Sequence, residues 1–277
     1  MKLAGGDGRK SVSTDSEQTD SLWIRSNKDS SKSVSISIPN RNEFYYPQQY
    51  GKMKCLILNY EEFTNKQPTR HGTQLDADTL DKTFKDFGFE CTTWNNLTLS
   101  ETKKVLDDAT KSNLNNFDGL ILCLLSHGDK DEISCKDQWI SIESIRNRFK
   151  SDRCPSLAGK PKLFFIQACR GTLFDSGTLV HDSLSSSLIR NDSRTFLIPT
   201  NADFLLFFST YEDLCQVLKE YRNQYDLMTM CTIVCQRIAF ERQSKSTDKF
   251  RNRKKQMPCI MSTLTRLVLI SKTTTDL

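Results

Sequence analysis

Residues 119–128 read GLILCLLSHG, an apolar run that ends in a polar triplet centred on His127. A second apolar run, residues 163–171, reads LFFIQACRG and leads to Cys169. Uninterrupted apolar stretches of this length are typical of parallel strands that are buried on both faces. Ligands bind beyond the carboxyl ends of such strands, so two neighbouring strands would bring an imidazole and a thiol to one edge of the sheet. The pattern predicts an α/β fold with a cysteine–histidine site.

The spacing of these two residues suits nucleophilic catalysis. A free thiol has a pKa near 8.5, so a cysteine nucleophile needs a base beside it. His127 precedes Cys169 by 42 residues, and the pentapeptide QACRG with a histidine roughly that far upstream is the local signature of caspases. The backbone amides of Gly128 and Cys169 are candidates for the oxyanion hole. A single cysteine in an apolar run is more often a core residue, which is the interpretation for Cys55, Cys123 and Cys259.

Composition narrows the class of protein. The chain has 277 residues, of which 37% are hydrophobic and 26% charged, enough for one substantial core or two small ones. No apolar run is long enough to span a membrane and no signal peptide opens the chain, so we expect a cytoplasmic protein with no membrane partner. The ten cysteines are expected to be reduced. Cys231 and Cys235 have no second Cys/His pair, and neither a metal nor another cofactor is expected.

The net charge of +5 is concentrated in one stretch. Residues 241–255 contain seven basic and two acidic residues, which accounts for the whole excess. Such a stretch binds an acidic partner or forms a solvated loop, and the loop is the favoured interpretation. Only Phe250 offers an aromatic ring there, which argues against nucleic-acid binding. A basic adaptor remains a third hypothesis, which requires an affinity that falls steeply with salt.

Strands and helices alternate along the rest of the chain. Further strands are expected over residues 53–58, 202–208 and 259–270. Asp76 is expected to cap a helix that Gly88 ends, and Thr98 with Glu101 matches a capping box. Other apolar faces at helical spacing are centred on residues 142–149, 214–221 and 228–238.

Residues from about 45 to 270 resemble the caspase family. The matching segments are RHGT (70–73), LSHG (125–128), LAGKPKLF (157–164), QACRG (167–171), ADFL (202–205) and KQMPCI (255–260). The resemblance implies a three-layer α-β-α fold with a mainly parallel central sheet, in which a large and a small subunit segment form one domain. It also implies a disordered short prodomain (1–40), a large segment (41–175), an exposed linker (176–194) and a small segment (195–277). The short, polar tail resembles the effector branch of the family.

The resemblance also assigns roles. Cys169 matches the nucleophile, His127 the acid and base, the carbonyl of Pro68 the group that orients the imidazole, and Arg70 with Gln167 part of the pocket for a substrate aspartate. Bidentate arginine contacts suit that planar carboxylate. The expected activity is cleavage after aspartate in programmed cell death.

The family is made as zymogens that are cut after aspartate. Asp182 is the first candidate for such a cut, followed by Asp175 and Asp192 in the linker and by Asp29 and Asp20 in the tail. Expected partners are protein substrates with exposed aspartates, an initiator caspase, inhibitor proteins, and a second copy or another caspase that pairs through residues 259–270.

One departure from the family lies after Thr210. Active relatives have a long loop there, which supplies a second pocket arginine and a backbone edge for the substrate, whereas only three residues separate Thr210 from Leu214 here. Ser209 and Glu212 fit a capping box that would let the strand turn directly into its helix. The chain is therefore expected to be an endopeptidase with impaired activity or, alternatively, a catalytically deficient caspase homologue or isoform that binds and regulates active caspases.

Overall fold

The computed structural model describes residues 44–129, 131–168, 199–241 and 258–270. Cys169, the five candidate processing aspartates, the tail 1–40, the linker 176–194 and the basic residues 242–255 lie outside the described residues.

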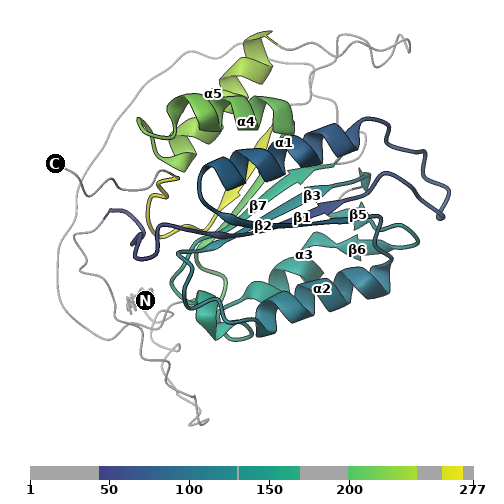
Figure 1. The fold of residues 1–277 in the computed structure, drawn as a ribbon, viewed down its shortest axis with the longest axis horizontal. Coiled ribbons are helices and arrows are strands. Elements are labelled where there is room, and N and C mark those ends of the chain that lie inside the picture. The colour runs from purple at the N-terminus through teal and green to yellow at the C-terminus, as the bar shows by residue number, and fades with distance from the viewer. Residues whose placement is uncertain (1–43, 130, 169–198, 242–257, 271–277) are drawn as a thin grey trace, which may run out of the picture. The chain divides into compact units, whose positions relative to one another are not determined.

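A six-stranded sheet lies at the centre of the fold, with its strands in the order β2-β1-β3-β7-β8-β9 (Figure 1). The strands are β1 (Lys54–Asn59), β2 (Glu90–Asn95), β3 (Leu120–Leu125), β7 (Lys162–Gln167), β8 (Phe204–Phe208) and β9 (Cys259–Ser262). The first five run parallel, and β9 pairs antiparallel with β8. The predicted mainly parallel sheet is thus confirmed, and strands from both the large and the small segment belong to it.

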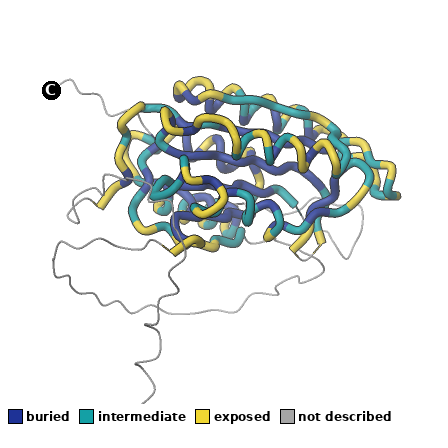
Figure 2. The backbone as a smooth tube through the Cα atoms, turned by 90° about the horizontal axis from the view of Figure 1, so that it is seen from below, coloured by how far each residue is buried: buried dark blue, intermediate teal, exposed yellow. Residues whose placement is uncertain are grey.

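Helices cover both faces of this sheet (Figure 1). On one face lie α1 (Thr73–Asp86), α4 (Tyr211–Tyr221) and α5 (Leu227–Glu241), and on the other lie α2 (Leu99–Lys111) and α3 (Ile142–Arg146). Alternate residues of each strand face opposite layers: Cys55 and Ile57 join the cluster beneath α1, whereas Leu56 and Leu58 join the cluster above α2. Figure 2 shows the strands as the buried interior. The arrangement is the three-layer α-β-α fold that was predicted.

A small second sheet follows β3. It consists of β4 (Gly128–Asp129), β5 (Glu132–Ser134) and β6 (Trp139–Ser141), which pair antiparallel. The 3₁₀ turns η1 (Asn147–Phe149) and η2 (Pro155–Leu157) connect α3 to β7. This small sheet begins at the residue after His127, so it supports the strand end where that side chain lies.

Two of the local helix signals are confirmed and one is wrong. Thr98 and Glu101 form the predicted capping box at α2, and Gly88 ends α1 with a positive φ of 83°. Asp76, however, does not cap α1. The N-cap is Gly72 at φ 88°, a conformation that glycine adopts without strain, and Asp76 lies inside the first turn.

The last predicted strand is shorter than expected. β9 ends at Ser262 instead of continuing to residue 270. The backbone bonds from Thr263 N to Phe204 O and from Asp203 N to Thr263 O (both 2.8 Å) close its pairing with β8. Beyond them the chain turns, and Leu267 forms an isolated bridge with Tyr45. Val268 and Ile270 of this segment are buried but belong to no strand, which explains why the apolar pattern continues beyond the end of β9.

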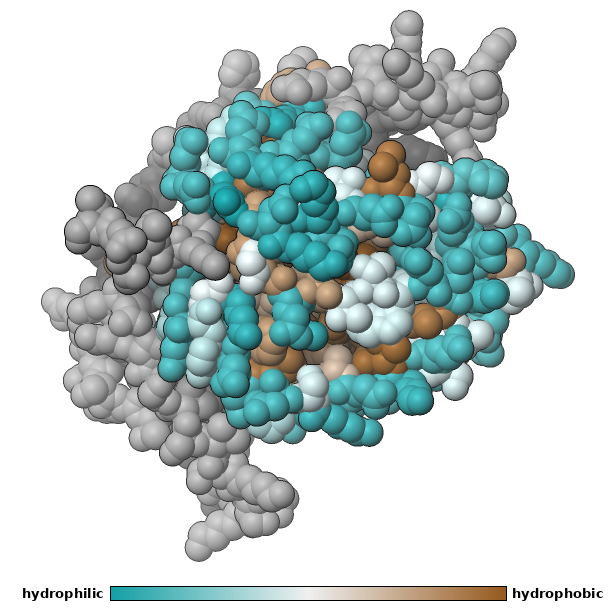
Figure 3. Space-filling model, in the orientation of Figure 1, coloured by the Kyte–Doolittle hydropathy of each residue, from teal (hydrophilic) through white to brown (hydrophobic). Residues whose placement is uncertain are grey.

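The face shown in Figure 3 is mostly hydrophilic, with apolar residues gathered in the band between the two helix layers. β2 is an edge strand of the sheet, and its four central residues are only partly buried. Within the described part of the chain, no helix has the length and apolar character needed to cross a membrane.

Candidate active site

His127 lies just beyond the carboxyl end of β3, and backbone contacts fix the chain on both sides of it. The amide of Ser126 donates to the carbonyl of Gln167 (3.1 Å), and the Ser126 hydroxyl donates to the carbonyl of Ser134 (2.5 Å). The carbonyl of His127 itself accepts from the amide of Ser134 (2.9 Å). The backbone at His127 is therefore held in place by hydrogen bonds to β5 and β7.

The imidazole contacts the carbonyl of Pro68. The distance from Nε2 to that oxygen is 2.7 Å. A carbonyl only accepts hydrogen bonds, so Nε2 must carry the proton, which leaves Nδ1 of the neutral ring with its lone pair free for proton transfer. This contact is the one expected for an orienting carbonyl. It selects the neutral tautomer with the proton on Nε2.

The end of β7 leads into Cys169. In the sheet register Leu125 of β3 pairs with Gln167 of β7, so residues two positions further along leave neighbouring strand ends. His127 and Cys169 are those residues, and Cys169 itself lies outside the described part of the chain. The arrangement is that of an α/β protein with a histidine and a cysteine following adjacent strands at one edge of the sheet.

Arg70 is anchored within the connection between β1 and α1. Its Nη1 donates to the carbonyl of Tyr60 (3.1 Å) and to the hydroxyl of Thr73 (2.8 Å). Thr73 in turn donates to Asn59 Oδ1 (2.8 Å), so the guanidinium is tied to the end of β1 and to the first turn of α1. The side chain remains partly exposed. These contacts hold the guanidinium at the start of α1.

Asp76 connects the two predicted pocket residues. Burial raises the pKa of the Asp76 carboxyl, whereas a hydrogen bond from Gln167 and the charge of Arg70 lower that pKa and the charge of Glu212 raises it. These influences mean that Arg70, Gln167 and Glu212 all lie close to one carboxyl group. The structure thus brings Arg70 and Gln167 together, and the sequence pattern had not indicated the acidic residue between them.

Two buried polar atoms at this edge have no hydrogen-bond partner among the residues that the structure describes. They are Oε1 of Gln167 and Oγ of Ser209. Gln167 ends β7 and Ser209 follows β8, and Ser209 N donates to Ile166 O (3.2 Å), so the two side chains leave adjacent strands. Buried polar groups without partners are uncommon in folded proteins and often mark functional positions.

The connection from β8 to α4 is very short. Only Ser209 and Thr210 lie between the two elements. The N-cap of α4 is Thr210, whose hydroxyl donates to Asp213 Oδ2 (2.7 Å), and no side chain accepts from a backbone amide there. The predicted capping box of Ser209 and Glu212 is therefore wrong, because the helix begins one residue later than the pattern indicated.

Tyr211 attaches α4 to the strands beneath it. The side chain is fully buried, and its hydroxyl accepts from Leu124 N (3.1 Å) and donates to Phe165 O (2.5 Å). Leu124 and Phe165 belong to β3 and β7, the strands that lead to His127 and Cys169. The short connection thus places an aromatic residue where it reaches both strands.

The described cysteines are free thiols, and most lie in the core. Cys55 and Cys123 are fully buried, as predicted, and burial raises the pKa of both thiols. Burial likewise raises the pKa of Cys215 to about 11. Cys259 is only partly buried. In the described residues no cluster of three or more His, Cys, Asp or Glu side chains is arranged to hold a metal.

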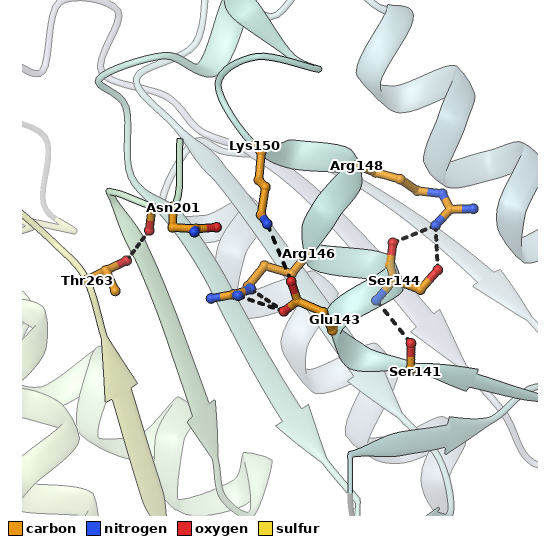
Figure 4. Close-up of polar contacts among 8 residues, drawn as sticks. All are labelled: Ser141, Glu143, Ser144, Arg146, Arg148, Lys150, Asn201 and Thr263. Carbon is orange, nitrogen blue, oxygen red and sulfur yellow. Dashed lines mark hydrogen bonds and ion pairs between the residues drawn. The ribbon is translucent and has the colours of Figure 1, made fainter. Parts of the chain in front are cut away.

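A second group of charges lies around α3 and η1, and Figure 4 shows Glu143 between Arg146 and Lys150. Glu143 accepts from Arg146 (2.6 Å) and from Lys150 (3.4 Å), and Arg148 pairs with Asp107 (2.8 Å). Partly exposed pairs of this kind contribute little individually. Because each of these cations already has an acidic partner, this surface is not a candidate anion site.

Comparison with known proteins identifies the family of this chain. The caspase-domain family model matches residues 52–213 and 211–269. The chain is 31% identical over 275 residues to caspase-1 of Spodoptera frugiperda, covering 92% of this chain and 91% of that protein. It is 35% identical over 243 residues to caspase-7 of Gallus gallus, covering 80% of this chain and 79% of that protein. The chain therefore belongs to the caspase family, which makes it a caspase-like cysteine peptidase by descent.

The fold agrees with this family. The crystal structure of caspase-1 from Spodoptera frugiperda matches the chain with a TM-score of 0.78 at 32% identity. The match covers 88% of this chain and 100% of that one. Both the layers and the strand order described above are thus those of a caspase fold.

Proposed function

We propose that this chain is an effector-type cysteine endopeptidase that cleaves after aspartate, with activity impaired by the short β8–α4 connection. The observation that carries this proposal is the imidazole of His127, held through Nε2 by the Pro68 carbonyl at the end of the strand beside the one that leads to Cys169. Programmed cell death, a zymogen cut first at Asp182, dimerisation through residues 259–270 and a cytoplasmic location follow from the family as parts of the same proposal.

In the proposed reaction Nδ1 of His127 takes the thiol proton of Cys169. The sulfur attacks the carbonyl carbon of the substrate aspartate, and the amides of Gly128 and Cys169 hold the resulting oxyanion. The imidazolium then gives its proton to the leaving amine as the carbon–nitrogen bond breaks. Water, deprotonated by the same imidazole, hydrolyses the thioester and restores the thiol. Arg70 and Gln167 bind the aspartate carboxylate.

The short connection supports a large loss of activity. One charge-assisted hydrogen bond to a buried carboxylate contributes about 1.5–3 kcal/mol, and an arginine fork makes more than one. Misplacing a substrate by about 1 Å costs on the order of 100-fold in rate. Ser209 and Thr210 provide neither a second arginine nor an extended edge, so specific cleavage is expected to be several orders of magnitude slower than in a caspase with the loop.

The same connection favours a second candidate function. A chain that keeps the fold of the family while its substrate side is incomplete suits a catalytically deficient homologue that binds active caspases and regulates them. The two ranges of the family match meet at residues 211–213, which supports a segment missing at this position. An evolved regulator and a shortened isoform both fit this pattern.

The test is cleavage of a fluorogenic acidic tetrapeptide ending in aspartate by the purified chain, cut at Asp182 if it does not process itself. Slow turnover that disappears in Cys169→Ala and in Arg70→Gln would support the endopeptidase. Activity equal to that of Cys169→Ala, in a protein that still unfolds cooperatively, would leave the regulator. In that case adding the chain to an active effector caspase should change that caspase's rate.

A further inference from the structure

The imidazole of His127 has a second neighbour, the ring of Phe63. The two ring centroids lie 4.9 Å apart with an angle of 49° between the planes. Phe63 is partly buried and packs against the hydrophobic cluster on the α2 face of the sheet. It belongs to the same β1–α1 connection as Pro68, so one segment of the chain contacts the imidazole twice.

The backbone around Phe63 is fixed on both sides. Before it, Oδ1 of Asn96 accepts from the amides of Glu61 (2.8 Å) and Glu62 (3.0 Å). After it, the amide of Thr64 donates to the carbonyl of Lys136 (2.7 Å). Asn96 adopts a positive φ of 53°, and its own amide donates to the carbonyl of Asn59 (2.8 Å). The phenyl ring is thus presented from a connection attached both to the end of β1 and to the segment after β5.

A single hydrogen bond does not fix the plane of an imidazole. The bond from Nε2 to Pro68 O locates one atom, and the ring can still turn about that bond and carry Nδ1 away from the end of β7. An aromatic ring against one face of the imidazole restricts that rotation, because tilted ring pairs at this distance attract each other. Together the two contacts define both the tautomer and the plane of His127.

We propose that Phe63 is a positioning residue for His127, which holds the plane of the imidazole while the Pro68 carbonyl holds its tautomer. This inference rests on the proposed function for its catalytic meaning, although the positioning itself exists whether or not the chain turns over substrate. The expected loss on removing the ring is an approximately 2- to 10-fold fall in the ratio of oriented to released imidazole.

The experiment is a nitrogen-15 NMR titration of the full-length chain, which contains three histidines. A His127→Gln variant assigns the resonances. In alkaline buffer the unsubstituted chain should show an excess of the Nε2–H tautomer at His127. An imidazole that is free to turn also leaves the Pro68 carbonyl more often, so Phe63→Leu should lower that tautomer ratio by the stated factor, and the conservative Phe63→Tyr should retain it. None of these readouts requires peptidase activity, so an inactive chain still tests the proposal.

The matched control is Phe117→Leu. Phe117 is buried in the same hydrophobic cluster as Phe63. It precedes β3, whereas His127 follows that strand, and the Phe117 ring lies 4.8 Å from the ammonium of Lys52. This substitution should lower thermal stability without changing the His127 tautomer ratio. If Phe63→Leu does the same and nothing more, Phe63 only packs and the proposal is overturned. If the unsubstituted chain shows no excess of the Nε2–H tautomer, orientation by Pro68 is refuted together with the role of Phe63.

A second variant guards against misfolding of Phe63→Leu. Asn96→Gly removes the side chain that holds Glu61 and Glu62 while tolerating the positive φ. It should shift the His127 tautomer ratio in the same direction, whereas Asn96→Asp, which keeps an acceptor oxygen, should not. A ratio unchanged in Asn96→Gly would contradict the idea that the fixed connection presents Phe63.

Discussion

Replacing Tyr211 with phenylalanine removes one hydroxyl from the contact between α4 and the central strands. That hydroxyl is fully buried. It accepts from Leu124 N (3.1 Å), and its single proton is shared between Phe165 O (2.5 Å) and Leu124 O (3.1 Å), so it satisfies one acceptor and one donor role. Each buried hydrogen bond contributes about 0.5–1.5 kcal/mol net, so the loss should be about 1–3 kcal/mol. Near the middle of that range, the melting temperature of a domain of this size should fall by about 4–8 °C.

The assay is urea unfolding of the Cys169→Ala background, which avoids self-cleavage, with thermal unfolding as a second measure. The matched control is Tyr225→Phe, because Tyr225 is 42% exposed and its substitution should change stability by less than about 0.5 kcal/mol. Equal losses in the two variants, or a loss below about 0.5 kcal/mol in Tyr211→Phe, would refute the idea that this hydroxyl fastens α4 to β3 and β7.

Three further predictions concern single positions. Burial lowers the pKa of Lys162 to about 8 from 10.5. Below pH 8 the buried ammonium is charged and lowers the unfolding free energy, and this destabilisation disappears as the pH rises to 10.5. Across this window the unfolding free energy of the native chain, relative to Lys162→Met, should rise by up to about 3 kcal/mol, whereas exposed Lys104→Met should show no such rise. Gly119→Ala should destabilise by about 1–3 kcal/mol because a Cβ would lie 2.6 Å from both Pro161 O and the Met53 side chain; an unchanged urea midpoint would contradict this. Thr98→Ala should lose about 1 kcal/mol with the capping box of α2, and Thr98→Ser should recover most of it in the same assay.

The buried strands β3 and β8 could be predicted because all of their residues are apolar, which is typical of strands that are covered on both faces. β3 and β8 consist entirely of buried residues, so each is read directly as an apolar run. β2 gave no such signal: its sequence, ECTTWN, is polar at four of its six positions and only partly buried, because it lies at the edge of the sheet. The end of β9 was also missed, since buried Val268 and Ile270 continue the apolar pattern after the strand has ended.

Some residues of the candidate site could likewise be predicted from the sequence, and others could not. The position of His127 after β3 could be predicted because the LSHG motif follows an apolar run, and the structure adds the contact of its imidazole with the carbonyl of Pro68. The catalytic roles of these groups stay predictions. Phe63 belongs to no motif, and its contact with the imidazole depends on backbone amides that donate to Asn96 and Lys136, which lie 33 and 73 residues further along the chain. Asp76 was misread as a helix cap since the true cap is Gly72, whose left-handed φ is visible only in three dimensions. Contacts between distant segments leave no local pattern in a sequence.

The short β8–α4 connection keeps the contact that attaches α4 to the sheet, whereas in the proposed function it lacks the loop that would bind substrate. The fold needs α4 against the sheet, and Tyr211 provides that contact directly after Thr210 by reaching the backbone of β3 and β7. In the proposed function a substrate aspartate needs partners around its carboxylate. Among the described residues, Gln167 Oε1 and Ser209 Oγ are buried without hydrogen-bond partners, and Arg70 lies near Asp76 and Glu212. A connection that left α4 loose would cost stability, whereas this one keeps α4 attached to the central strands. Selection for stability alone would therefore tolerate the short connection, whatever its effect on the proposed cleavage.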